Sequence, residues 1–126
     1  MAVGSIKILV VDDFATMRKI IKNQLGQLGF KNILEADDGS TALIMLKKER
    51  FDLIIADWNM PRMSGLDLLK SARGDENYKN TPFVMVTAEA NKNNIVAAIQ
   101  AGANDYIIKP FNVNTLQEKI KKIFEQ

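Results

Sequence analysis

The chain has 126 residues and no cysteine, a length that suits one domain with its own hydrophobic core and a composition that excludes a disulfide-stapled scaffold. No apolar stretch is long enough to cross a bilayer, and residues 1–5 lack the basic and apolar regions of a signal peptide, so we expect a cytoplasmic protein. The net charge is only +2 and the lysines and arginines are scattered, which argues against a nucleic-acid-binding surface.

Five short apolar runs predict strands, and segments with helical spacing of apolar residues separate them. In the first helical segment Met17, Ile20, Ile21, Leu25 and Leu28 recur at that spacing, and Gly29 is placed to end it. The predicted strands are near-continuously apolar, as is typical of strands buried on both faces. They cover about 6–11, 33–36, 52–57, 82–87 and 105–108.

The later helices carry recognisable start and stop signals. Asp38 is placed to cap a helix that begins at Gly39, and Ser64 and Asp67 have the spacing of a capping box. The fourth helix carries Ile95, Ala98 and Ile99 and is expected to stop at Gly102. The fifth presents Leu116, Ile120, Ile123 and Phe124 on one face and is capped by Asn112 or Asn114.

This alternation predicts an α/β fold with a five-stranded parallel sheet covered by helices on both faces. Right-handed crossovers leave few topologies. We expect the doubly wound, flavodoxin-like (βα)5 arrangement with the known strand order 2-1-3-4-5, which places the topological switch point between the first and third strands.

Polar side chains follow the strands where their carboxyl ends should meet. Asp12 and Asp13 follow the first strand, Asp57 ends the third, Thr87 ends the fourth and Lys109 follows the fifth. Each has an ordinary explanation taken singly, as a helix cap or a solvated side chain, but their joint placement favours one shared site. Clustered carboxylates need a cation, and an all-oxygen ligand set favours Mg²⁺. A carboxylate beside Mg²⁺, with Lys and Thr opposite, suits attack on phosphorus.

The chain resembles the receiver domains of two-component response regulators, and within them the chemotaxis regulators, over about residues 6–125. The matching motifs are Val10-Val11-Asp12-Asp13-Phe14, Asp57-Trp58-Asn59-Met60-Pro61, Met85-Val86-Thr87-Ala88-Glu89-Ala90 and Lys109-Pro110-Phe111. The resemblance implies a single receiver domain over 1–126 without an output domain. It implies a phosphoacceptor that assists its own phosphorylation and dephosphorylation rather than an enzyme.

The resemblance also implies roles for individual residues. Asp57 would accept the phosphoryl group, and Thr87 and Lys109 would bind its oxygens. Mg²⁺ would be held by Asp12, Asp13, Asp57 and the backbone carbonyl of Asn59. Asn59 and Glu89 would tune hydrolysis, Thr87 and Tyr106 would form the switch, and the Lys109–Pro110 peptide would be cis.

The implied partners are a chemotaxis histidine kinase (CheA), the flagellar motor switch protein (FliM) and a phosphatase such as CheZ, with no membrane or nucleic acid and a monomeric chain. Apolar residues rimmed by lysines suit a short amphipathic acidic segment. The expected partner surface consists of Ala90, Lys92, Ile95, Ile99, Tyr106, Ile108 and Lys119.

Alternative functions share parts of this pattern. A metal-dependent phosphohydrolase with an aspartate nucleophile uses similar residues, although Asp12-Asp13-Phe14 differs from the Asp-x-Asp arrangement of the haloacid dehalogenase group. A flavodoxin-type FMN carrier is disfavoured because two carboxylates would repel its phosphate. A receiver of another two-component pathway, or one that binds partners without phosphorylation, would share the fold.

Overall fold

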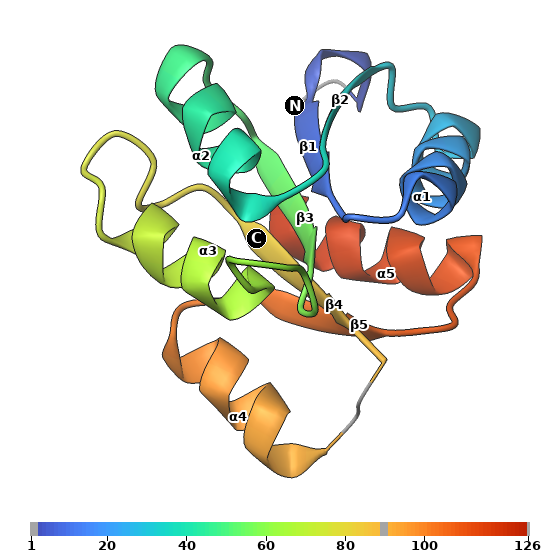
Figure 1. The fold of residues 1–126 in the computed structure, drawn as a ribbon. Helices are drawn as coiled ribbons and strands as arrows, with labels where there is room; N and C mark the ends of the chain where they lie inside the picture. The colour runs from blue at the N-terminus through green and yellow to red at the C-terminus, as the bar shows by residue number, and fades with distance from the viewer. Residues whose placement is uncertain (1–2, 89–90, 126) are drawn as a thin grey trace.

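The structure is a computed structural model that describes residues 3–88 and 91–125 (Figure 1). A short 3₁₀ turn, Val3–Ser5, precedes the first strand. The strands are β1 (Lys7–Val11), β2 (Asn32–Ala36), β3 (Leu53–Asp57), β4 (Phe83–Thr87) and β5 (Asp105–Ile108). The helices are α1 (Ala15–Gln27), α2 (Gly39–Lys48), α3 (Gly65–Arg73), α4 (Lys92–Gln100) and α5 (Val113–Phe124).

The five strands are all parallel and lie in the order β2-β1-β3-β4-β5, which confirms the predicted doubly wound fold. Helices α1 and α5 cover one face of the sheet, and α2, α3 and α4 cover the other (Figure 1). Each face has its own core. Ile8, Ile107 and Leu116 belong to the α1/α5 side, and Leu9, Met85 and Ala98 belong to the opposite side.

Burial on both faces holds for the three central strands but not for the two edge strands. Every residue of β3 and β4 is buried, whereas β2 exposes Asn32 and Glu35 and β5 exposes Ile108. The expectation that all five strands are buried was therefore wrong for β2 and β5. The reason is that an edge strand has a neighbour on one side only, and the helices cover it incompletely.

The predicted capping residues lie where the helices begin. Asp38 accepts a hydrogen bond from Thr41 N at 2.8 Å, and Ser64 and Asp67 form the reciprocal capping box of α3. Asn112, and not Asn114, caps α5.

The predicted helix ends and apolar faces are also largely confirmed. Gly29 and Gly102 have φ of 97° and 106°, a conformation that favours glycine, and they follow α1 and α4. Ile20, one of the apolar residues that recur at helical spacing in α1, is exposed instead, and Ile99 of α4 is exposed, as its predicted place on the partner surface requires.

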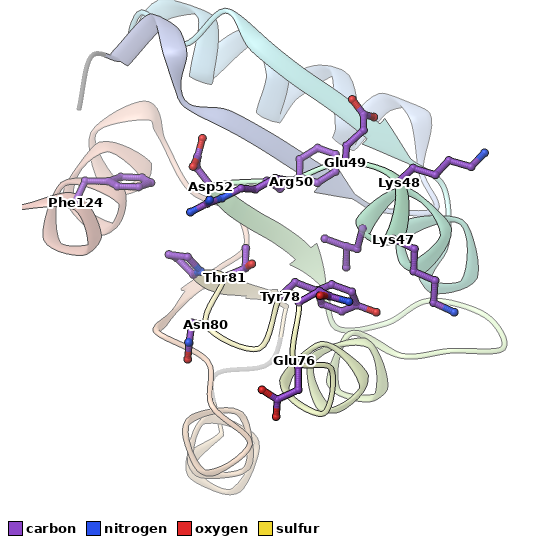
Figure 2. Close-up of a pocket in the computed structure, with 14 residues that line it drawn as sticks. Lys47, Lys48, Glu49, Arg50, Asp52, Glu76, Tyr78, Asn80, Thr81 and Phe124 are labelled. Carbon is purple, nitrogen blue, oxygen red and sulfur yellow. The ribbon is translucent and has the colours of Figure 1, made fainter.

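A cavity of about 620 Å³ lies between the end of α2 and the loop that precedes β4, at the amino ends of β3 and β4 (Figure 2). Its lining includes Lys47, Arg50, Tyr78 and Phe124. It is at the opposite end of the sheet from the predicted site. Among the described residues, no helix is long and apolar enough to span a membrane.

Candidate functional site

The first two carboxylates of the site follow β1, and local hydrogen bonds position Asp12. Asp12 is completely buried. Its Oδ1 accepts a hydrogen bond from Phe14 N at 2.9 Å, and its backbone carbonyl accepts one from Arg18 Nη1 at 2.7 Å. Asp13 is half-buried, but its Oδ1 is buried and has no hydrogen-bond partner among the described residues. Asp12 and Asp13 therefore do not cap α1, whose first turn follows Phe14 without a side-chain cap.

Asp57 ends β3, the central strand beside β1, and is 5% exposed. One carboxylate oxygen from each of Asp12, Asp13 and Asp57 lies within 4.8 Å of the others. The predicted carboxylate cluster is therefore present, at the switch point of the sheet.

Lys109 supplies the positive charge of the site. Its Nζ lies 2.9 Å from Asp57 Oδ1 and 3.4 Å from Asp12 Oδ2. Its backbone N–H donates to Thr87 O at 2.8 Å, which ties the end of β5 to the end of β4, and the Lys109–Pro110 peptide is cis, as the resemblance implied. One ammonium thus bridges two of the three carboxylates.

The electrostatics of the site follow from this arrangement. Burial raises the pKa of Asp57, the ion pair with Lys109 opposes this, and the charges of Asp12 and Asp13 add to the increase. Burial would lower the pKa of Lys109, but the hydrogen bond and charge of Asp57, together with Asp12, outweigh burial and raise it. Lys109 is therefore held as a cation, and the site still carries more negative than positive charge.

A hard divalent cation fits these donors. Three carboxylates within 4.8 Å of one another repel, and Lys109 contacts only two of them. The unpartnered buried Oδ1 of Asp13 is the kind of atom that a metal ion would satisfy. Oxygen ligands with no histidine or cysteine match the preference of Mg²⁺.

The other predicted site residues lie around this cluster. Thr87 is buried at the end of β4, and Asn59 is exposed in the loop after Asp57. Tyr106 is partly buried and packs against the core on the α4 side. Trp58 also packs against this core, and its backbone N–H donates to Val86 O at 2.8 Å. Glu89, predicted to tune hydrolysis, and Ala90, predicted on the partner surface, lie outside the described residues.

The register of the sheet relates Thr87 to Tyr106. Thr87 pairs with Ile108, and Met85 pairs with Tyr106, on adjacent parallel strands. Because side chains alternate along a strand and paired residues point the same way, Thr87, Tyr106 and Ile108 share the face covered by α4. The two predicted switch residues thus belong to the same side of the sheet, one strand apart.

Sequence reasoning missed the role of Gly65, which lies between the two capping-box residues Ser64 and Asp67. A Cβ at Gly65 would lie 2.3 Å from the backbone oxygen of Asp57, and Gly65 N donates to Trp58 O at 2.8 Å. The start of α3 therefore packs directly on the backbone of the phosphoacceptor candidate. A glycine at the start of a helix can indicate a close backbone contact. The sequence does not show that the contacting group is the backbone of Asp57.

Comparison with known proteins agrees with the fold. The family model described as response regulator receiver domain matches residues 8–121. Chemotaxis protein CheY-3 of Vibrio cholerae serotype O1 is 59% identical over 122 residues, which cover 97% of this chain and 94% of that protein. Chemotaxis protein CheY of Pseudomonas aeruginosa is 58% identical over 120 residues, covering 95% and 97%. The crystal structure of V. cholerae CheY4 aligns with a TM-score of 0.88 at 35% identity and covers 94% of this chain and 98% of its own.

The chain therefore belongs to the response regulator receiver domain family and, within it, is a chemotaxis receiver of the CheY type. Proteins of this kind act in signalling and are not classical enzymes. The predicted family is thus confirmed.

Proposed function

We propose that this chain is a single-domain cytoplasmic response regulator that accepts a phosphoryl group on Asp57 from a chemotaxis histidine kinase. The observation that carries the proposal is the pairing of a buried aspartate with Lys109 at 2.9 Å inside a cluster of three carboxylates. The strong identity to proteins named chemotaxis protein CheY supports the choice of pathway.

Mg²⁺ is the proposed cofactor, held by Asp12, Asp13, Asp57 and the backbone carbonyl of Asn59. When bound, it would supply positive charge that offsets the oxygens of the incoming phosphoryl group. Among these ligands, Asp13 would be stabilised most by the ion, because its buried Oδ1 otherwise has no hydrogen-bond partner among the described residues.

The chain's own residues perform the transfer. A carboxylate oxygen of Asp57 forms a bond to phosphorus while the bond between phosphorus and the histidine nitrogen of the kinase breaks, and the imidazole leaves with that electron pair. Lys109, already beside Asp57 Oδ1, stabilises the charge on the transferred oxygens, and the Thr87 hydroxyl donates a hydrogen bond to one of them. Hydrolysis of the acyl phosphate, tuned by Asn59 and Glu89, returns the site to its starting state.

We propose that the movement of Thr87 toward the phosphoryl group is relayed to Tyr106 on the same face of the sheet. A change in the Tyr106 ring position would then alter the surface formed by α4, β5 and α5. This is a local change of charge that biases a packing arrangement with two states.

The proposed partner of that surface is the flagellar motor switch protein FliM, with CheA and a phosphatase such as CheZ as the other partners of a monomeric chain. The described residues support a protein-binding surface here, because Val96, Ile99 and Ile108 are large, apolar and at least 39% exposed. Exposed Lys92 lies at the start of α4, beside this apolar group.

The test of phosphorylation is mass spectrometry after incubation with Mg²⁺ and a small phosphodonor such as acetyl phosphate. We expect one added phosphoryl group, located on Asp57, absent in Asp57→Asn and absent when a chelator removes the divalent cation. Asp52→Asn is a matched control, because Asp52 directly precedes β3, far from the carboxyl end that carries Asp57, and accepts a hydrogen bond from Lys7 N. Equal modification of wild type and Asp57→Asn would overturn the assignment, and continuous release of phosphate from simple esters would favour the phosphohydrolase instead.

A further inference from the structure

Lys119, on α5, is held by two groups of the edge strand β5. Its Nζ donates a hydrogen bond to Asp105 Oδ1 at 3.0 Å and lies 4.7 Å from the centroid of the Tyr106 ring. Helix α5 covers one face of the sheet, whereas Tyr106 packs on the other (Figure 1). Lys119 therefore reaches around the open side of β5 to contact the proposed switch residue.

Asp105 is pre-organised to hold this ammonium. Its Oδ1 also accepts a hydrogen bond from Tyr106 N at 2.8 Å, which fixes the carboxylate against the backbone of its own strand. The Asp105 and Lys119 side chains are only 17% and 22% exposed, so solvent and salt screen the pair less than a surface ion pair. By contrast, Lys121 of α5 and Glu125, the residue that caps the end of this helix, are 3.8 Å apart, and each side chain is 63% exposed.

The same ammonium is part of the surface proposed to bind an acidic segment. Lys119 adjoins Tyr106, and Ile108 lies two residues further along β5 on the same face. A partner carboxylate that pairs with Lys119 must either displace Asp105 from the ammonium or share the ammonium with it, and in both arrangements the two carboxylates lie close together. Like charges at such a distance repel, so Asp105 weakens binding both by occupying Lys119 and by repelling the partner's carboxylate.

We propose that Asp105 is an intramolecular competitor for Lys119, which sets the affinity and charge specificity of this surface for acidic protein segments. The inference rests on the proposed function in one respect, that the surface of α4, β5 and α5 is the docking surface. Asp105 acts through Lys119 and is therefore a positioning residue. Release of Lys119 also removes the cation from the Tyr106 ring, so binding of the partner and the position of the Tyr106 ring are coupled.

The first experiment needs no partner and uses NMR of the full chain. In wild type the Lys119 ammonium should give slowly exchanging N–H signals, and Asp105→Asn should abolish them and shift the Tyr106 ring protons. Asn keeps an oxygen that can accept from Tyr106 N, so the strand should be preserved. Lys121→Met is the matched control and should leave both signals unchanged. Unchanged Lys119 and Tyr106 signals in a folded Asp105→Asn protein would overturn the proposal.

The second experiment is a double-mutant cycle measured by calorimetry with two synthetic amphipathic peptides, one bearing glutamates and one with glutamines in their place. We expect Asp105→Asn to bind the glutamate peptide about three- to tenfold more tightly than wild type and the glutamine peptide equally. The gain should vanish in the Lys119→Met background. A gain that persists without Lys119, the absence of any gain, or no binding by Asp105→Asn would each overturn the competition.

The same titrations with a phosphoryl mimic bound separate this inference from the proposed switch. If the mimic leaves affinity unchanged while Asp105→Asn still strengthens binding, the switch fails and the competition stands. If the mimic strengthens binding while Asp105→Asn has no effect, the competition fails and the switch stands.

Discussion

Asp13 has the least compensated charge of the three site carboxylates. Lys109 contacts Asp57 and Asp12, whereas the buried Oδ1 of Asp13 has no partner among the described residues. We therefore expect Mg²⁺ to stabilise the folded protein, by about 1.4 kcal/mol at ten times its dissociation constant, or about 5 °C in melting temperature.

Asp13→Asn tests this expectation, because an amide is a poorer ligand for a hard cation. Thermal melts with and without Mg²⁺ should show most of the shift lost in Asp13→Asn, while Asp67→Asn, an exposed position in the α3 capping box, should keep it. Trp58 fluorescence gives a second readout, since Trp58 follows Asp57 directly and packs against the core. A full Mg²⁺ shift in Asp13→Asn would exclude Asp13 as a ligand.

Asp57 should destabilise the metal-free protein at neutral pH. Burial raises its pKa, so the folded state binds this proton more tightly than the unfolded state does. The ionised carboxylate therefore reduces stability above the folded-state pKa, and the reduction is relieved as the pH falls through that value.

Replacing Asp57 by Asn removes this titration, so with a chelator present Asp57→Asn should melt at a higher temperature than wild type at pH 7. The difference should shrink as the solution is acidified. Chemical unfolding at several pH values would measure it. A lower stability of Asp57→Asn at pH 7 would mean that the ion pair with Lys109 outweighs the burial of the carboxylate.

At the scale of elements, the contact between α3 and β3 depends on Gly65. A Cβ there would meet the backbone oxygen of Asp57 at 2.3 Å, and the backbone cannot move away as a flexible side chain could. We expect Gly65→Ala to lower the free energy of unfolding by about 1–3 kcal/mol and to slow phosphorylation of Asp57 by displacing it.

Gly26→Ala is the matched control, because Gly26 lies in α1 and its added Cβ would have no neighbour within 4 Å. Alanine favours the helix by up to about 1 kcal/mol, so this variant should be slightly more stable and should phosphorylate normally. Equal behaviour of the two variants in denaturant titrations would refute the close contact.

The elements themselves could largely be predicted from the sequence. Apolar periodicity located the five strands within one residue at each end, and capping residues such as Asp38 and Ser64 marked helix starts, because these signals depend on neighbours along the chain. The carboxylate cluster followed because parallel strands end at one edge of the sheet.

Other features depend on contacts between distant segments and could not be predicted in this way. The incomplete cover of β2 and β5 depends on how helices pack at the sheet edges. Lys119 was expected to be an ordinary surface lysine of the docking face, and its pairing with Asp105 appears only when α5 is placed beside β5. The approach of Gly65 to Asp57 likewise follows from tertiary packing.

For the whole molecule, the carboxylate cluster and the proposed docking surface of α4, β5 and α5 are connected through one sheet. Thr87 ends β4, Tyr106 lies on the neighbouring β5, and both side chains belong to the face covered by α4. A structural change at Asp57 therefore needs to pass only through Thr87 and Tyr106 to reach the exposed apolar residues of α4 and β5. Such coupling between two sites has a typical free energy of about 1–3 kcal/mol and acts equally in both directions.

The most direct test of coupling between Asp57 and the proposed docking surface is the affinity of a motor-switch peptide for the protein with and without a phosphoryl mimic at Asp57. We expect the mimic to tighten peptide binding by about 5- to 150-fold, and the peptide to increase affinity for the mimic by the same factor. Tyr106→Ala should reduce this coupling while leaving Asp57 able to accept a phosphoryl group. Equal peptide affinities with and without the mimic, in a protein that is phosphorylated normally at Asp57, would show that Asp57 is not coupled to the surface of α4, β5 and α5.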